Sequence, residues 1–291
     1  MTSSKHQRIF MTGAGGYCGR SITELAISEG YEVRGLSRSE ASDAAIRGLG
    51  AVPVRGDLTS LSVLREESAA ADIVIHLATA FNFFDGGSYD DVLPIDNAAV
   101  DALADGLAGT DKPLVCTSGT LVVAADPEGK ETDEATPPHT NPVLTRGKNE
   151  RHALSLAQAR GVRVMVVRLA PYVYGRGGSG VRAFMEHGAK AGGVLCVDGG
   201  KNRITSVHVD DAARLYLLAA QRGRAGELYN ASANTDALGK LLSWFIAAES
   251  RASAAKARKE FGWKPTRAGI LEEIKDGSYK AVAEALRKGS A

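Results

Sequence analysis

The stretch from Arg8 to Gly30, RIFMTGAGGYCGRSITELAISEG, limits the fold of the whole chain more than any other feature. A short apolar run meets a cluster of glycines and then an amphipathic segment, which predicts a strand, a tight turn and a helix. Gly13 permits the turn, Gly16 lets backbone N–H groups approach a pyrophosphate, and Gly19 lets the helix pack close to the strand. The stretch therefore predicts a dinucleotide site at the helix N-terminus; the alternative is a glycine turn without a ligand.

The segments that follow repeat the same order of elements along more than half of the chain. This alternation predicts an α/β fold, a doubly wound parallel sheet of the Rossmann type with helices on both faces. We expect strands at Arg8–Thr12, Glu32–Leu36, Val52–Arg55, Ile73–Leu77, Leu114–Thr117 and Arg163–Leu169. We expect helices at Gly16–Glu29, Ala41–Leu49, Leu61–Glu67, Asp91–Leu107 and Arg146–Arg160.

Beyond Pro171 the strand and helix rhythm loosens, beginning with a glycine-rich loop, YGRGGSG. A helix, short strands around Val194 and Ile204, and a helix at Val209–Gln221 are expected next. A chain of 291 residues is long enough for a dinucleotide-binding domain at 1–170 and a smaller substrate-binding lobe at 171–291. We expect this lobe to be interleaved with the sheet and its last helices to pack back on the first domain.

Charge and composition exclude several kinds of partner. The 35 basic and 34 acidic residues nearly cancel, so no charge field for a nucleic acid or a membrane surface is expected. Three cysteines without a C-x-x-C spacing favour a reducing compartment over a disulfide framework. The start of the sequence lacks the apolar region of a signal peptide, and no apolar run is long enough to span a bilayer. We therefore expect a cytoplasmic protein.

Short motifs along most of the chain carry a resemblance to a known family. The glycine turn has the spacing T-G-x-x-G-x-x-G, from Thr12 to Gly19. The other motifs are GDL at Gly56–Leu58, HLAT at His76–Thr79, TSGT at Thr117–Thr120, RGKNE around Lys148, RLAPYVYG at Arg168–Gly175, VHVDDAARLYLLA at Val207–Ala219 and AKARKEFGW at Ala255–Trp263. Together they resemble the short-chain dehydrogenase/reductase superfamily, in its extended or atypical NAD-dependent epimerase/dehydratase branch.

The resemblance implies where a cofactor would bind. The aspartate of the GDL motif, Asp57, would meet the adenine with Leu58 beside it, and Ala78 and Thr79 would lie along the cofactor. Lys148 would hold the nicotinamide ribose. The pyrophosphate would lie against the residues of the glycine turn, namely Gly13, Gly16, Tyr17, Cys18 and Gly19.

The end of the second expected strand bears on the choice of cofactor. An acidic residue there would accept hydrogen bonds from the ribose of NAD, whereas this chain has Ser37 and Arg38. Both side chains can donate to an added 2′-phosphate. NADP(H) is therefore favoured over NAD(H). The alternative is that Arg38 stacks on the adenine or points to solvent, which would leave NAD(H) as the cofactor.

The catalytic residues of the family are only partly present. The family uses a tyrosine as proton donor or acceptor, a lysine four residues later and a serine that polarises the substrate oxygen. The lysine is Lys148, but Leu144 occupies the position of the tyrosine. An ungapped match places Gly119 at the serine position, so Ser118 and Thr120 are the candidate hydroxyls.

Three routes could replace the missing tyrosine. Tyr174 or Tyr172, in the loop after the sixth expected strand, could supply a phenol, although the resemblance favours a role in the substrate wall. Lys148 could protonate a product through a water molecule or the ribose. Alternatively, the substrate could need only a hydride, with the proton coming from solvent.

The substrate site is less clearly marked. Phe81, Phe83 and Phe84 follow the fourth expected strand, which suggests an apolar substrate wall or ordinary core filling. Tyr172 and Arg203 are further candidates for substrate contact. The histidines show no metal-ligand spacing, so no metal is expected. The lobe is short near 234–238, where the chain is either truncated relative to the family or lacks a segment.

These observations predict an NADP(H)-dependent oxidoreductase that transfers hydride to or from a carbonyl, alcohol or imine of a small molecule. One alternative is a nucleotide-sugar epimerase or dehydratase, which the missing tyrosine disfavours. The other is a redox sensor that binds NADP(H) and has lost catalysis. The resemblance also implies a homodimer, paired through the helices at Asp91–Leu107 and Arg146–Arg160.

Overall fold

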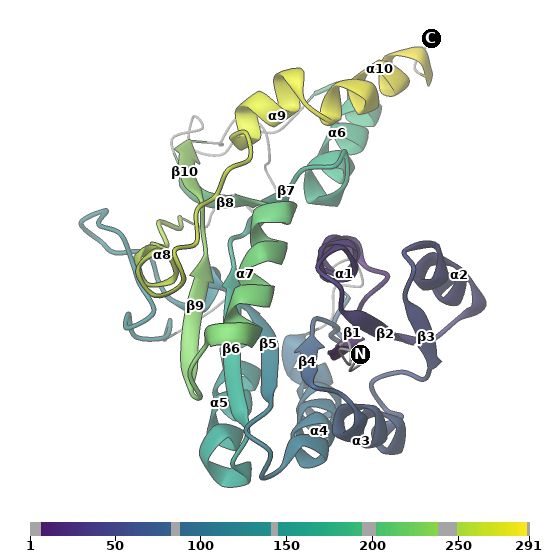
Figure 1. The fold of residues 1–291 in the computed structure, drawn as a ribbon. Helices are drawn as coiled ribbons and strands as arrows, with labels where there is room; N and C mark the ends of the chain where they lie inside the picture. Colours follow the sequence, from purple (N-terminus) through teal and green to yellow (C-terminus); the bar gives the residue numbers. More distant parts are fainter. Residues whose placement is uncertain (1–6, 83–87, 141–144, 194–201, 238–248, 290–291) are drawn as a thin grey trace. The chain divides into compact units, whose positions relative to one another are not determined.

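The computed structural model describes residues 7–82, 88–140, 145–193, 202–237 and 249–289 (Figure 1). The chain divides into two compact units. The first unit comprises Met1–Ser118, Val143–Val167 and Ala213–Tyr229. The second unit comprises Gly119–Pro142, Arg168–Ala212 and Asn230–Ala291. The two units interleave along the chain, and the predicted domain division at residue 170 stays a prediction.

A seven-stranded parallel sheet confirms the predicted fold class. Its strand order is β3-β2-β1-β4-β5-β6-β9. Of the six predicted strands, three have the predicted bounds and three differ by one or two residues at one or both ends, whereas β9 was not predicted. The strands are β1 (Arg8–Thr12), β2 (Glu32–Ser37), β3 (Val52–Arg55), β4 (Ile73–His76), β5 (Pro113–Gly119), β6 (Arg163–Leu169) and β9 (Glu227–Ala231).

The order of the strands reverses between β1 and β4, which pair in parallel with Thr12 opposite His76. In open α/β sheets, ligands bind outside the carboxyl ends of the strands at such a point. The glycine turn joins β1 to the helix that follows it and therefore lies at the expected ligand position.

The helices that alternate with the strands of this sheet are α1 (Tyr17–Ser28), α2 (Glu40–Gly48), α3 (Leu61–Ala70), α4 (Tyr89–Leu107), α5 (Gly147–Arg160) and α7 (Val209–Arg222).

The core of the first unit lies between the sheet and the helices α3, α4 and α5 (Figure 1). Alternate residues of each strand face these helices because side chains alternate across a strand. On β5 the residues on this face are Leu114 and Cys116, which are both buried. They pack with Val100 and Leu103 of α4 and Leu156 of α5. The starts of α4 and α5 are thereby held on one side of the sheet.

The second unit contains a three-stranded mixed sheet, β10-β8-β7. Its strands are β7 (Tyr172–Tyr174), β8 (Arg203–His208) and β10 (Asn234–Ala237). A small core gathers on it, with Tyr172, Tyr174, Ile204, Ile270 and Tyr279 all buried. The remaining elements are a 3-10 turn (Thr120–Val122), α6 (Ser179–Ala191), α8 (Ala255–Phe261), α9 (Ile270–Asp276) and α10 (Tyr279–Gly289).

One prediction falls on residues that the structure does not describe: the strand around Val194. In the short segment at 234–238, residues 234–237 are described and form β10. The strand predicted around Ile204 is present as β8, and the helix predicted at Val209–Gln221 is α7. Within the described ranges, no helix is long and apolar enough to cross a membrane.

Candidate functional site

The glycine turn has the geometry that a pyrophosphate needs. Gly13 has φ of +75°, and its carbonyl accepts the Gly16 N–H at 2.9 Å. A Cβ added to Gly19 would lie 2.0 Å from the Gly13 carbonyl oxygen, so only glycine allows α1 to start this close. Gly16 is the N-cap residue of α1, and no side chain caps the N–H groups of the first turn of this helix. The turn therefore leaves backbone donors and space for an anion.

A buried threonine and histidine fix this turn to the neighbouring strand. The Thr12 hydroxyl accepts the N–H groups of Leu77 and Ala78, both at 3.2 Å. It lies 2.8 Å from Nδ1 of His76 and donates its proton there, since its acceptor positions are taken. His76 is neutral in this arrangement, and burial lowers its pKa to about 4. The candidate cofactor contact Ala78 is thus held beside the turn.

The segment after β2 adjoins the glycine turn. A Cβ added to Gly15 would lie 3.6 Å from Oγ of Ser42, in the first turn of α2. The buried Ser37 donates its hydroxyl proton to the Ser39 carbonyl at 3.1 Å. Arg38 is exposed and forms no hydrogen bond or ion pair with any described residue. Of the two predicted phosphate donors, only Arg38 is therefore uncommitted.

The GDL motif forms a tight local turn after β3. Oδ1 of Asp57 accepts the Thr59 N–H at 2.9 Å, the Thr59 hydroxyl at 2.7 Å and the Ser60 hydroxyl at 3.2 Å. These bonds, led by the one from the Thr59 hydroxyl, lower the pKa of Asp57 and keep it ionised. Leu58 is buried in the core below the turn. Their predicted contact with adenine stays a prediction.

The two cysteines that the structure describes, Cys18 and Cys116, do not supply a reactive thiolate to this turn. Cys18 lies in the first turn of α1 and Cys116 on β5, and burial raises the pKa of each thiol to about 12. A thiol with so high a pKa stays protonated at neutral pH and is a poor nucleophile. Tyr17, at the start of α1, is half-buried. The part of Tyr17 and Cys18 in cofactor binding stays a prediction.

A buried aspartate organises the segment after β4. Asp96 of α4 accepts the Thr79 hydroxyl at 2.6 Å, the Ala80 N–H at 2.8 Å and the Tyr89 hydroxyl at 3.0 Å. The Phe81 ring lies 5.3 Å from that of Tyr89, which supports the predicted place of Phe81 beside this segment. Phe83 and Phe84 lie outside the described residues. The sequence reasoning did not identify Tyr89 or Asp96.

The start of α5 brings Lys148 to the first turn of α4. Nζ of Lys148 donates to Oδ1 of Asp90 at 2.9 Å, and the Thr145 hydroxyl donates to the same oxygen at 2.6 Å. Both bonds lower the pKa of Asp90, and the bond from Thr145 has the larger effect. The lysine is about half exposed and so remains within reach of a ligand. Leu144 lies outside the described residues.

Arg146 is a second cation at the start of α5, and the sequence reasoning missed it. Its Nη2 donates to the Thr117 carbonyl at 2.9 Å, and its Cζ lies 5.8 Å from the centre of the Tyr89 ring. One feature of the sequence could have pointed to Arg146: it lies at the N-cap of a helix, where a cation is unfavourable because it opposes the helix dipole.

The two candidate hydroxyls occupy different units. Ser118, at the end of the first unit, is buried, and its Oγ has no hydrogen-bond partner among the described residues. Thr120 belongs to the second unit, is buried, and lies with Oγ1 3.4 Å from Oγ of Ser250.

The remaining candidates lie in the second unit. Tyr174 is fully buried and donates its hydroxyl proton to the Ala268 carbonyl at 2.7 Å, while burial raises its pKa. Tyr172 is buried as well, with its pKa raised by burial, and Arg203 is exposed at the start of β8. Proton transfer from Tyr174 would require its bond to Ala268 to break.

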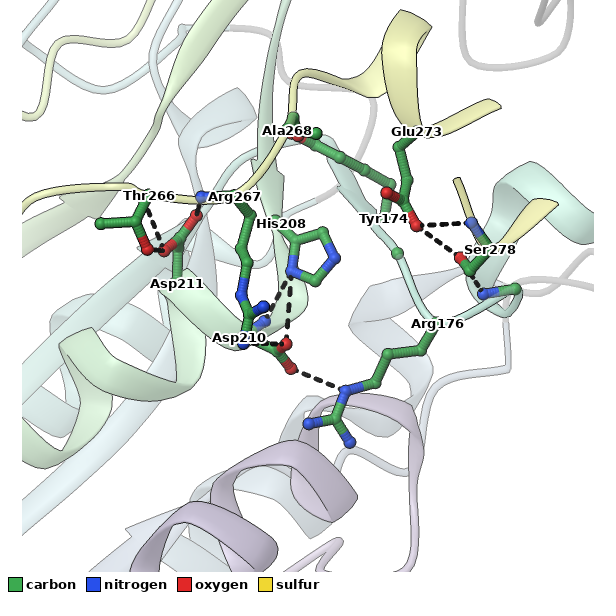
Figure 2. A network of polar contacts seen from close by, with 12 residues as sticks. Tyr174, Arg176, His208, Asp210, Asp211, Thr266, Arg267, Ala268, Glu273 and Ser278 are labelled. Atoms are coloured by element: carbon green, nitrogen blue, oxygen red, sulfur yellow. Dashed lines mark hydrogen bonds and ion pairs between the residues drawn. The ribbon is translucent and has the colours of Figure 1, made fainter. Parts of the chain in front are cut away.

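A polar network surrounds His208 at the end of β8 (Figure 2). Its Nδ1 accepts the Asp210 N–H at 3.1 Å. The Asp210 carboxylate binds Arg176 at 2.6 Å and Arg267 at 3.0 Å. The Asp211 carboxylate accepts the N–H groups of Thr266 and Arg267, which lie more than fifty residues away in the sequence.

Comparison with known proteins establishes the relationship of the chain. A model of the NAD dependent epimerase/dehydratase family matches residues 9–232. The chain belongs to this family. An uncharacterized Schizosaccharomyces pombe protein is 31% identical, with 94% of this chain and 99% of that protein aligned. The 4-hydroxy-2-methyl-3-oxo-4-farnesyl-3,4-dihydroquinoline-1-oxide ketoreductase of Stigmatella aurantiaca is 28% identical, over 76% of this chain and 67% of that enzyme.

The fold is also found in solved structures. The UDP-glucose 4-epimerase of Thermotoga maritima aligns over 98% of this chain and 100% of its own, with a TM-score of 0.76 and 20% identity, a likeness of fold alone. Nicotinamide dinucleotides are the cofactors typical of the family, which includes oxidoreductases and epimerases. The glycine turn of the first unit fits such a group, because Gly19 lets α1 start close to β1 and no side chain caps the N-terminus of α1.

Among the described residues, no group of three or more His, Cys, Asp or Glu side chains is placed to hold a metal ion. The expectation that the protein uses no metal stays a prediction.

Proposed function

We propose that this protein is an NADP(H)-dependent oxidoreductase that transfers hydride between the nicotinamide and the carbonyl or alcohol carbon of a small molecule. The observation that carries the proposal is the glycine turn, whose uncapped α1 N-terminus and missing side chains suit a pyrophosphate. Membership of the family and the ketoreductase relative support the reaction class. Compartment and homodimer formation remain expectations: a cytoplasmic setting and pairing through α4 and α5.

The preference for NADP(H) rests on Arg38. It is exposed at the end of β2, beside the glycine turn, and has no partner in the described ranges. A guanidinium in this place can bind the 2′-phosphate through charge-assisted hydrogen bonds. Ser37 is buried below it and shapes the loop through its bond to Ser39.

Replacing Arg38 with aspartate is expected to weaken NADPH binding by roughly tenfold or more, because a charged hydrogen bond is lost and a like charge is added. NADH binding should strengthen, since a carboxylate can accept bonds from the ribose hydroxyls. Titration followed by nicotinamide fluorescence measures both affinities. Arg151→Asp, the same charge change at an exposed position of α5, serves as the control. An unchanged ratio of the two affinities in Arg38→Asp would refute the assignment.

The chain supplies groups for hydride transfer, but neither candidate tyrosine readily gives up a proton. The Tyr172 hydroxyl is buried without a hydrogen-bond partner among the described residues, and burial raises its pKa. When bound, the nicotinamide supplies or accepts the hydride. Lys148 would hold the nicotinamide ribose in exchange for its present bond to Asp90, and Ser118 or Thr120 would donate to the substrate oxygen. The proton of Tyr174 is committed to Ala268. This arrangement favours the route in which solvent supplies the proton to an activated carbonyl or imine.

Oxidation of NADPH in the presence of a panel of aldehydes, ketones and imines tests the proposal. At saturating NADPH, Lys148→Met is expected to lower turnover by roughly tenfold or more, because the ribose loses its anchor. Thr120→Val and Tyr174→Phe test the other candidate groups in the same assay. Lys280→Met, at an exposed site on α10, is the matched control. Tight NADPH binding without turnover on any compound would favour the redox sensor over the enzyme.

A further inference from the structure

Arg146 is a half-buried cation with unused hydrogen-bonding capacity. Its guanidinium donates one bond, to the Thr117 carbonyl, and lies over the Tyr89 ring. Within the described part of the chain it forms no ion pair with a carboxylate. A guanidinium has several further N–H donors in a planar fork, which matches the two oxygens of a carboxylate. The side chain is thus held in place while most of its donors stay available.

No described carboxylate forms an ion pair with Arg146. It stands at the N-cap of α5, the positive end of a helix dipole, and Lys148 follows within the first turn. Lys148 is paired with Asp90, but Arg146 has no such partner among the described side chains. Asp96 is already bound by Thr79, Ala80 and Tyr89. A partly buried cation placed against a helix dipole is costly unless a bound anion compensates it.

A second, independent observation comes from Ser118. Ser118 is only 3% exposed, and a buried hydroxyl normally has a hydrogen-bond partner. Oγ of Ser118 has none in the described residues. Ser118 continues the face of β5 that carries Leu114 and Cys116, so it points to the side of α4 and α5. It directly follows Thr117, the residue that Arg146 binds. An unpartnered hydroxyl therefore lies on the residue next to the one whose carbonyl binds the unpaired guanidinium.

We propose that Arg146 binds a carboxylate of the substrate while Ser118 donates to the neighbouring carbonyl oxygen, so that the substrate class is a short oxo acid. This inference rests on the proposed function, since Ser118 is taken there as the donor to the reacting oxygen. A single guanidinium neutralises one negative charge, which suits a monocarboxylate. The carboxylate then lies only a few atoms from the carbonyl, because Arg146 is anchored to the residue next to Ser118.

The test uses acetoacetate and its neutral analogue methyl acetoacetate, which differ in the carboxylate. Both are titrated calorimetrically into protein saturated with NADP+, which cannot deliver a hydride. Arg146→Gln is expected to weaken acetoacetate binding by roughly tenfold to a hundredfold, the loss of a charge-assisted hydrogen bond. Arg146→Lys should retain part of the affinity, and binding of the ester should not respond to either change. Arg151→Gln, an equal charge change on the exposed side of α5, should leave acetoacetate binding unchanged.

Two outcomes would overturn the inference: equal acetoacetate affinity in wild type and Arg146→Gln, or no saturable binding of acetoacetate to the wild type at millimolar concentration. Far-UV circular dichroism checks that the variants are folded. If Arg146→Gln does not fold, the acetoacetate affinity of Arg146→Lys provides the test. The titrations are repeated without NADP+, and NADP+ binding is measured by itself. Failure of NADP+ binding alone would refute the proposed function, whereas failure of acetoacetate binding alone would refute only the carboxylate subsite.

Discussion

Gly19→Ala is expected to weaken NADPH binding by roughly a hundredfold or more, with a loss of stability of about 1–3 kcal/mol. The added Cβ would stand 2.0 Å from the Gly13 carbonyl oxygen and 2.8 Å from the Gly13 carbonyl carbon. Backbone atoms cannot rotate away, so α1 must move from β1 and carry its N-terminal N–H groups with it. Nicotinamide fluorescence titration measures the affinity, and urea denaturation measures the free energy of unfolding.

Gly48→Ala is the matched control for this prediction. Gly48 ends α2 in the same unit, and a Cβ added there would meet nothing within 4 Å. We expect this variant to keep its NADPH affinity and to gain slightly in stability, because alanine restricts the unfolded chain. If Gly19→Ala binds NADPH as tightly as Gly48→Ala does, the pyrophosphate does not lie on this turn.

Gly175→Ala is expected to destabilise the second unit by about 3 kcal/mol or more, the sum of a steric clash and backbone strain. Gly175 has φ of +110°, and a Cβ there would lie 2.1 Å from Nε2 of His208. His208 cannot swing away without breaking its bond to the Asp210 N–H, which belongs to the network of Arg176 and Arg267 (Figure 2). Thermal and urea unfolding, each followed by circular dichroism, measure the loss.

Gly180→Ala tests whether the effect is specific to this contact. Gly180 lies in α6 a few residues further on, where the added Cβ would be 3.6 Å from the Phe184 ring, an ordinary contact. Alanine has the higher helix propensity, so this variant should be as stable as the wild type or slightly more stable. Equal stability of Gly175→Ala and Gly180→Ala would contradict the packing of His208 against the loop.

Much of the first unit could be predicted because local patterns determine it. The strand at Arg163–Leu169 has four apolar residues in a row between two arginines, and the structure has the same bounds. The glycine turn was predictable because only glycine allows the approach of α1 to β1. Strand β5 extends past the predicted Thr117 to Gly119, since backbone pairing continues beyond the apolar residues. Hydrophobic periodicity does not carry that information.

The polar cluster at the ends of β4 and β5 could not be predicted in the same way. Tyr89 and Asp96 belong to α4, and Arg146 precedes α5, some fifty residues later in the sequence. Only the packing of α4 and α5 on the same face of the sheet brings them together. Ser37 shows the opposite case, because its hydroxyl finds a partner two residues away, in Ser39. Serine hydroxyls often form hydrogen bonds with backbone groups that are close in the sequence.

The hydroxyl of Tyr279 determines when the second unit can be completed during protein synthesis. It accepts the Gly175 N–H at 2.9 Å and donates to the Gly178 carbonyl at 2.8 Å. Tyr279 is translated 104 residues after Gly175. Until it leaves the ribosome, a nascent chain carries this loop without its brace. The loop of a nascent chain is therefore open to chaperones and proteases while the residues between Gly175 and Tyr279 are being made.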